Sequence, residues 1–243
     1  MNGTSAPATY TSGNVLNFTT TRQAELGALL NTRDGRTFRY VKAGVADLVV
    51  GNVIQGPAEV TLNQQLTAVI TAVGSRTISA INGATAITAN QYAGGWAIID
   101  TAPGLGYAYP IASHPAVAGA ATGVFTLHPD ALVQVALTGV SRVSLVANPY
   151  NGVIQSPITT LTGAVVGVAV APIPAGQYGW VQISGPGAVL IAGTPGVGLA
   201  VVVPGTVAGC VVVDGAAAAT KVIGSMLVTG VNGKVQGVLL DIQ

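Results

Sequence analysis

Two histidines and one cysteine are the side chains of this sequence best suited to metal binding or nucleophilic catalysis. His114 and His128 are each followed by proline, and Asp130 is the only carboxylate beside His128. This spacing matches no standard zinc site, which needs clustered His, Cys or carboxylate ligands, so we expect both histidines in loops at strand ends. Cys210 stands in an apolar run and is expected to be a small buried side chain. The sequence therefore predicts no enzyme activity, with no catalytic residue, metal ligand or cofactor site.

Both tryptophans follow the same short phrase, in "ANQYAGGWAIID" and "AGQYGWVQIS". A fold that builds one corner twice would use the glycines for a tight turn and lay the tryptophan over the core, with the tyrosine hydroxyl at the edge. A sugar-binding surface would instead expose the tryptophans beside polar residues, and almost none stand near the second phrase. We therefore expect two structural corners, formed by Tyr92, Gly94, Gly95 and Trp96 and by Tyr178, Gly179 and Trp180.

Four basic residues lie close together in the first quarter of the chain: Arg33, Arg36, Arg39 and Lys42. On a strand, Arg36 and Arg39 would face opposite sides. The stretch is either an ordinary solvated segment or a docking surface for an acidic protein partner, which arginines bind through paired hydrogen bonds to carboxylates. Reversing the charge at Arg36 and Arg39 is expected to abolish docking and leave the fold intact.

The composition is poor in charge: charged residues make up 7% of the 243 residues, hydrophobic residues 50%, and the net charge is +1. This balance gives no electrostatic basis for nucleic-acid binding. A chain with so few charges is expected to bury part of its surface against other molecules. We therefore expect a homo-oligomer or a lattice-bound protein. The apolar run 197–213 is broken by Pro204-Gly205 and predicts two buried strands around a turn rather than a membrane span.

The pattern of the chain is that of an all-β protein. Short β-branched runs, separated by Gly, Pro, Asn or Ser, follow one another from residue 37 to the end. Residues 1–20 predict an extended arm, and 19–31 the one short helix. Asn232-Gly233, between apolar runs, predicts a type I′ hairpin turn.

The chain is expected to divide into three consecutive parts. Residues 1–45 would form the arm, the helix, the first strand and the docking region. Residues 46–150 and 151–243 would form two β-barrel or β-sandwich domains, because "NPYNGVIQSP" has the composition of a connector between them.

Several blocks of this sequence resemble the head decoration, or cement, proteins of tailed bacteriophages. They are "DGRTFRYVKAG", "ANQYAGGW", "SHP", "NPYNGV" and "VGVAVAPIPAGQYGWVQISGPGAVL" with the following "GTPGVG". The resemblance implies a structural protein, a trimer on the outer surface of the virion capsid, that clamps neighbouring major capsid protein subunits. It also implies that the C-terminal part is a small barrel or β-tulip. A receptor- or glycan-binding virion protein and a major capsid or tail subunit remain alternatives.

Overall fold

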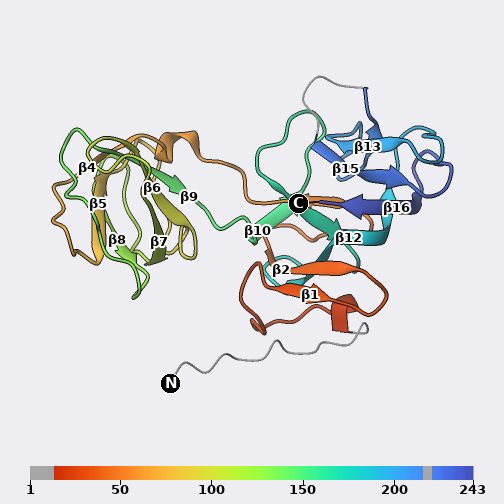
Figure 1. The fold of residues 1–243 in the computed structure, drawn as a ribbon, viewed down its shortest axis with the longest axis horizontal. Helices are drawn as coiled ribbons and strands as arrows, with labels where there is room; N and C mark the ends of the chain where they lie inside the picture. The colour runs from red at the N-terminus through yellow and green to blue at the C-terminus, as the bar shows by residue number, and fades with distance from the viewer. Residues whose placement is uncertain (1–13, 216–220, 243) are drawn as a thin grey trace. The chain divides into compact units, whose positions relative to one another are not determined.

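The chain folds into two compact units, each built from β-strands (Figure 1). The structure is a computed structural model and describes residues 14–215 and 221–242. One unit comprises Met1–Pro57 and Pro149–Gln243, and the other is Ala58–Asn148. The predicted all-β fold with two barrel-like units is confirmed. The three predicted consecutive parts are not what the structure shows, because strand pairing joins the first strands to those that follow residue 150.

The Ala58–Asn148 unit is a closed antiparallel barrel of six strands in the order β4-β5-β8-β7-β6-β9. The strands are β4 (Leu66–Ala68), β5 (Thr77–Ile81), β6 (Trp96–Thr101), β7 (Ala108–Ser113), β8 (Thr122–Leu127) and β9 (Arg142–Val146), and the short 3-10 helix η2 (Thr61–Asn63) precedes them. Every second residue of β8 is buried, as expected where one face of a strand meets the core. The inward side chains form one apolar core that includes Ile78, Ile99, Ile111, Phe125 and Leu145.

The other unit contains ten strands in the order β1-β2-β10-β3-β11-β12-β16-β15-β13-β14. They are β1 (Leu29–Asn31), β2 (Thr37–Ala43), β3 (Val53–Gln55), β10 (Asn151–Gln155), β11 (Val165–Ala169), β12 (Tyr178–Leu190), β13 (Ala200–Val203), β14 (Val212–Val213), β15 (Lys221–Met226) and β16 (Val235–Asp241).

The long strand β12 belongs to two apolar cores in succession. Its first half pairs with β2, and this pairing closes a ring of β2, β10, β3, β11 and β12 around Val41, Ile54, Val153 and Val181. Its second half pairs with β16, and the bridge between Ile191 and Val211 closes a second ring through β15, β13 and β14. The second ring encloses a core that includes Val201, Ile223, Val238 and Leu240.

The predicted helix over 19–31 is wrong. Its last three residues are the strand β1, whose Leu30 pairs with Phe38 of β2, and the only helical turn near it in the described part of the chain is the 3-10 helix η1 (Asn14–Leu16). Gly27 has a φ of +87°, and its N–H donates to the carbonyl of Tyr40, so this segment bonds to β2 instead of to itself. The predicted arm lies largely outside the described residues.

Two turn predictions have different outcomes. β13 and β14 flank Pro204-Gly205 and pair with each other, so the two predicted strands around this turn are confirmed. Asn232-Gly233 does form a turn, in which the Lys234 N–H donates to the Val231 carbonyl. Only Gly233 has a positive φ, however, which excludes type I′. The β15–β16 connection spans residues 227–234 and is longer than the two-residue hairpin loop that type I′ requires.

Candidate docking surface

The four predicted docking residues lie on β2 and on the turn that leads into it. β1 and β2 are joined by a tight turn, in which Gly35 has a φ of +81° and the Thr32 N–H donates to the Arg36 carbonyl at 3.0 Å. Arg33, in this turn, is exposed and has no hydrogen-bond or ion-pair partner among residues 14–215 and 221–242.

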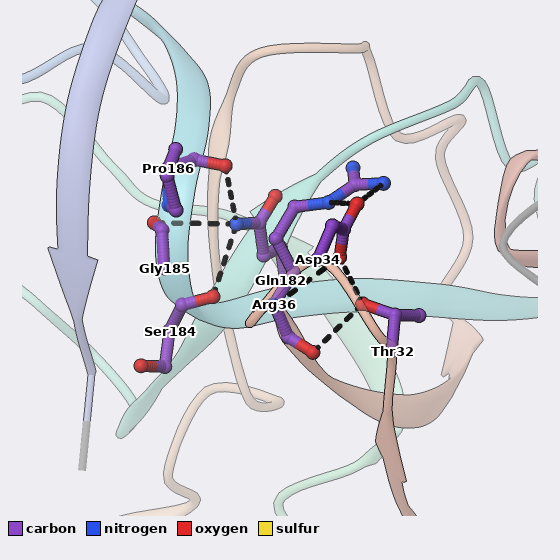
Figure 2. A network of polar contacts seen from close by, with 7 residues as sticks. All are labelled: Thr32, Asp34, Arg36, Gln182, Ser184, Gly185 and Pro186. Atoms are coloured by element: carbon purple, nitrogen blue, oxygen red, sulfur yellow. Dashed lines mark hydrogen bonds and ion pairs between the residues drawn. The ribbon is translucent and has the colours of Figure 1, made fainter.

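Arg36 is held by a carboxylate of the same turn (Figure 2). Its Nε donates to Asp34 Oδ2 at 2.8 Å, its Nη2 lies 2.7 Å from the same oxygen, and its guanidinium stands 5.3 Å from the ring centre of Phe38. Thr32 Oγ1 donates to the other carboxylate oxygen of Asp34. These hydrogen bonds, that from Arg36 first, lower the pKa of Asp34 to about 2.

The lowered pKa predicts how the Asp34 contribution to stability depends on pH. The folded-state pKa of about 2 lies below the ordinary value of 3.8, so the contribution is complete above about pH 4 and is lost as the pH falls toward 2. Urea unfolding of the wild type and of Asp34→Asn should therefore show a stability difference at pH 6 that shrinks between pH 4 and pH 2. Glu59→Gln, at an exposed carboxylate of the other unit, is the control. A difference that stays constant over this range would contradict the prediction.

Arg39 and Lys42 also have partners within the chain. Arg39 Nη1 donates to the Gly27 carbonyl at 2.7 Å, and its guanidinium lies 5.5 Å from the ring centre of Tyr150. Lys42 Nζ lies 5.7 Å from the ring centre of Tyr178. Of the four, only Arg33 could bind a partner without giving up a contact within the described chain. Reversing the charge of Arg39 would also remove a fold contact, so this substitution is not the clean docking test that the sequence suggested.

A buried glutamine fixes the point where β12 passes from one ring to the next. Gln182 Nε2 points at three backbone carbonyls, those of Ser184 (3.0 Å), Gly185 (3.3 Å) and Pro186 (2.9 Å) (Figure 2). The β2–β12 register shifts at this place, and Gly185 has a φ of +87°. A Cβ on Gly185 would lie 2.7 Å from the Gly35 carbonyl oxygen, so the turn between β1 and β2 packs directly against this bend of β12. Gln182 is not among the residues predicted from the sequence, although a single amide within an apolar strand was a usable signal.

The two tryptophan corners are not equivalent, which corrects the prediction of one corner built twice. Trp180 is 5% exposed and packs against Tyr40, with ring centres 5.0 Å apart. Trp96 is 38% exposed, because the first residue of β6 faces outward. The tyrosines differ too: Tyr92 is buried, its hydroxyl donates to Asn63 Oδ1 at 2.7 Å, and burial raises its pKa to about 12. Tyr178 is only half-buried.

The two histidines also differ from each other. His114 is buried, and its Nε2 accepts a hydrogen bond from the Tyr92 N–H at 3.0 Å while Nδ1 lies 2.8 Å from the Pro115 carbonyl. This ring therefore holds the turn before Trp96 in place, a role that the predicted loop position did not include. His128 lies in an exposed loop beside Asp130. The described residues contain no group of three or more His, Cys, Asp or Glu side chains that could hold a metal ion.

Aliphatic side chains crowd one end of the six-stranded barrel. Hydrogen bonds from Gly74 to Val133 and from Ser141 to Pro103 tie three loops together at this end, 69–76, 102–107 and 128–141. These loops carry the four most exposed large aliphatic residues of the unit, which we call the aliphatic end: Ile70 (82%), Val140 (64%), Leu105 (63%) and Val73 (62%). Large aliphatic side chains gathered in this way mark interaction surfaces.

Comparison with known proteins places the chain in no group, since no family model, curated protein or solved structure matches it significantly. Within the described part of the chain, no helix is long and apolar enough to cross a membrane.

Proposed function

We propose that the chain is a structural virion protein that binds the outer surface of a tailed-phage capsid and clamps neighbouring subunits of the major capsid protein. The observation that carries this proposal is the amount of exposed aliphatic surface on a chain with 7% charged residues. Such a surface favours association with other molecules, including further copies of the chain. The resemblance of its sequence blocks to phage cement proteins supports the same function.

The aliphatic end is the surface that we expect to contact the capsid shell. Its four side chains stand on three loops that hydrogen bonds tie together at one end of a closed barrel, a support that loses little conformational freedom on binding. Arg33 is the one predicted docking residue that remains available as a second contact. A protein that binds only the assembled shell stabilises it by the free energy of binding, and many copies act together through avidity.

The first test is the copy number of the chain in purified phage particles, measured by quantitative mass spectrometry against the major capsid protein. We expect a near-stoichiometric ratio, because a cement protein occupies every equivalent site of the shell. A few copies per particle would move the protein to a tail, fibre or vertex. Absence from particles would overturn the virion proposal.

Docking itself is tested with particles that lack the protein. We expect Ile70→Glu and Val140→Glu to lower shell occupancy at least tenfold at a limiting protein concentration, and Arg33→Glu to lower it less. Val45→Glu is the control, because Val45 is 98% exposed in the other unit. Equal occupancy for all four variants would show that the aliphatic end does not face the shell.

A receptor- or glycan-binding virion protein is the second candidate, and the exposure of Trp96 favours it. The ring stands on the outer face of β6, where Trp96 pairs with Pro110 of β7. Since Trp180 is buried, a shift of tryptophan emission on adding host polysaccharide would point to Trp96 and support this candidate.

A further inference from the structure

The wall of the second ring opens on one side of β14. Just before β14, the Val211 N–H donates to the Leu190 carbonyl at 2.9 Å, and the Ala192 N–H donates to the Val211 carbonyl at 2.8 Å. The next bonds of this parallel ladder would run from the Val213 N–H to the Ala192 carbonyl and from the Thr194 N–H to the Val213 carbonyl. Neither bond forms. We call this opening the β14 gap.

Gly193 causes the opening, because it turns the chain away from β14. Its φ is +80°, and its N–H donates to Asn232 Oδ1 at 2.8 Å. On the other side of β14, the Asp214 N–H donates to the Ala200 carbonyl at 3.0 Å. Successive residues of a strand bond in opposite directions, so the N–H and the carbonyl of Val213 point into the gap. Neither group has a partner among residues 14–215 and 221–242.

The β14 gap is also a pocket with mainly apolar walls. Its volume is about 380 Å³, and its lining contains no charged side chain. Besides the groups already named, the lining includes Pro195, Leu199, Thr206 and Val212. Unpaired backbone groups at an apolar pocket favour an extended peptide over a small apolar molecule, because a peptide backbone supplies both a carbonyl for the N–H and an N–H for the carbonyl.

The small number of hydrogen bonds favours a peptide that is attached to this chain. A hydrogen bond formed on binding replaces one with water, so each bond adds little to the affinity. A gap that pairs with only one residue of β14 would therefore bind a free peptide weakly. A segment tethered nearby is present at an effective concentration in the millimolar range, which is enough to occupy a weak site.

Residues 1–13 provide a tethered segment of suitable composition. None of them is charged, which matches the uncharged lining of the gap. They include Thr9, Tyr10 and Thr11, residue types that favour strands. The sequence analysis predicts that this part of the chain is extended.

The segment is also long enough to reach the gap. It joins the described chain just before Val15, which belongs to the same buried cluster as Trp180 of β12. Ala192 follows Trp180 by twelve residues, a distance of at most about 40 Å along an extended strand. Thirteen extended residues span about 43 Å. The bend of β12 at Gly185 makes the direct distance shorter than this limit.

We propose that residues 1–13 bind in the β14 gap of their own chain as an added strand. Their backbone accepts a hydrogen bond from the Val213 N–H and donates one to the Val213 carbonyl. The added strand covers an otherwise open sheet edge, which would be a site for unwanted pairing with other chains. This inference does not rest on the proposed virion function.

Hydrogen exchange of single amides, read by NMR, tests whether the segment occupies the gap. The Val213 amide should exchange at least threefold more slowly in the full chain than in a variant that lacks residues 2–13. The Val211 amide is bonded to Leu190 in both proteins, so its unchanged exchange rate would show that the deletion leaves the fold intact. Equal exchange of Val213 in the two proteins would overturn the proposal.

A substitution in the gap gives the same test without a deletion. Leu199 lines the gap and is 47% exposed, so Leu199→Lys should displace the segment and accelerate exchange at Val213 as the deletion does. Val45→Lys is the matched control, because Val45 is 98% exposed and is not among the residues of the gap. Unchanged exchange at Val213 in Leu199→Lys would contradict the proposal.

A nitroxide spin label on Ser5→Cys tests which chain supplies the strand. Cys210 is 1% exposed and should not react with the label. In a labelled, isotope-enriched chain, the label should broaden the amide signal of Val213. A mixture of labelled chains without enrichment and enriched chains without label should show no broadening. Broadening in the mixture alone would assign the strand to a second copy and overturn the own-chain arrangement, and no broadening in either sample would overturn binding in the gap.

Discussion

Replacing Trp180 with alanine should lower the free energy of unfolding by about 3–5 kcal/mol, the range found for large aromatic residues removed from a core. The ring is 5% exposed and packs against Tyr40 in a cluster that includes Val15, Leu30 and Phe38. This cluster attaches the segment before β2 to the outside of the first ring. Its loss should therefore affect the N-terminal segment first.

Trp96→Ala provides the matched comparison, because it removes the same side chain from a position that is 38% exposed. We expect it to cost less than about 1 kcal/mol, as is usual for surface substitutions. Hydrogen exchange read by mass spectrometry reports on each unit separately. Trp180→Ala should accelerate exchange in peptides from 14–57 and from β12, and should leave 58–148 nearly unchanged. Similar losses for the two variants would show that both tryptophans are core residues.

The strands were predictable from the sequence because their signal is local. Thr77–Ile81, which lies among the β-branched runs between turn residues, alternates buried and outward residues, and the structure makes it β5. The segment before β1 has a helical pattern, with Ala24 and Leu26 among its apolar residues, and yet it forms no helix. Both side chains pack against the cluster of Phe38 and Trp180 instead. Tertiary contacts with distant strands decided this segment, and no local pattern contains them.

The same reason limits what could be predicted of the candidate site. A run of basic residues is visible in the sequence, but the carbonyl of Gly27 and the ring of Tyr150, which contact Arg39, come from other parts of the chain. The insertion of 58–148 between strands of one unit was equally hidden, because it depends on β2 pairing with β12 across the whole insertion. The aliphatic end needed the barrel closure that brings its three loops together.

Gly95→Ala should be the most damaging small substitution in the six-stranded barrel. A Cβ at this position would lie 2.1 Å from the Val146 carbonyl oxygen and 3.0 Å from backbone atoms of Ala147 and Asn148. These are backbone atoms at the end of β9, where Trp96 pairs with Val146, so they can move only if the β6–β9 pairing opens. We expect a loss of about 3 kcal/mol or more, at or above the upper range for overpacked sites.

Gly139→Ala is the control for this prediction, since a Cβ there meets nothing within 4 Å and its φ is not positive. It should change stability by less than about 0.5 kcal/mol, and hydrogen exchange of peptides from 58–148 measures both variants. Gly179→Ala, at the second corner, should fall between them, because its Cβ would meet the buried side chain of Ile173, with Cδ1 at 2.5 Å and Cγ1 at 2.9 Å, rather than backbone atoms. This order would show that the glycine before each tryptophan is required for a different reason. At Gly95 a neighbouring strand's backbone leaves no room for a side chain, whereas at Gly179 the obstacle is a side chain, that of Ile173. Equal effects at both corners would instead restore the hypothesis of one corner built twice.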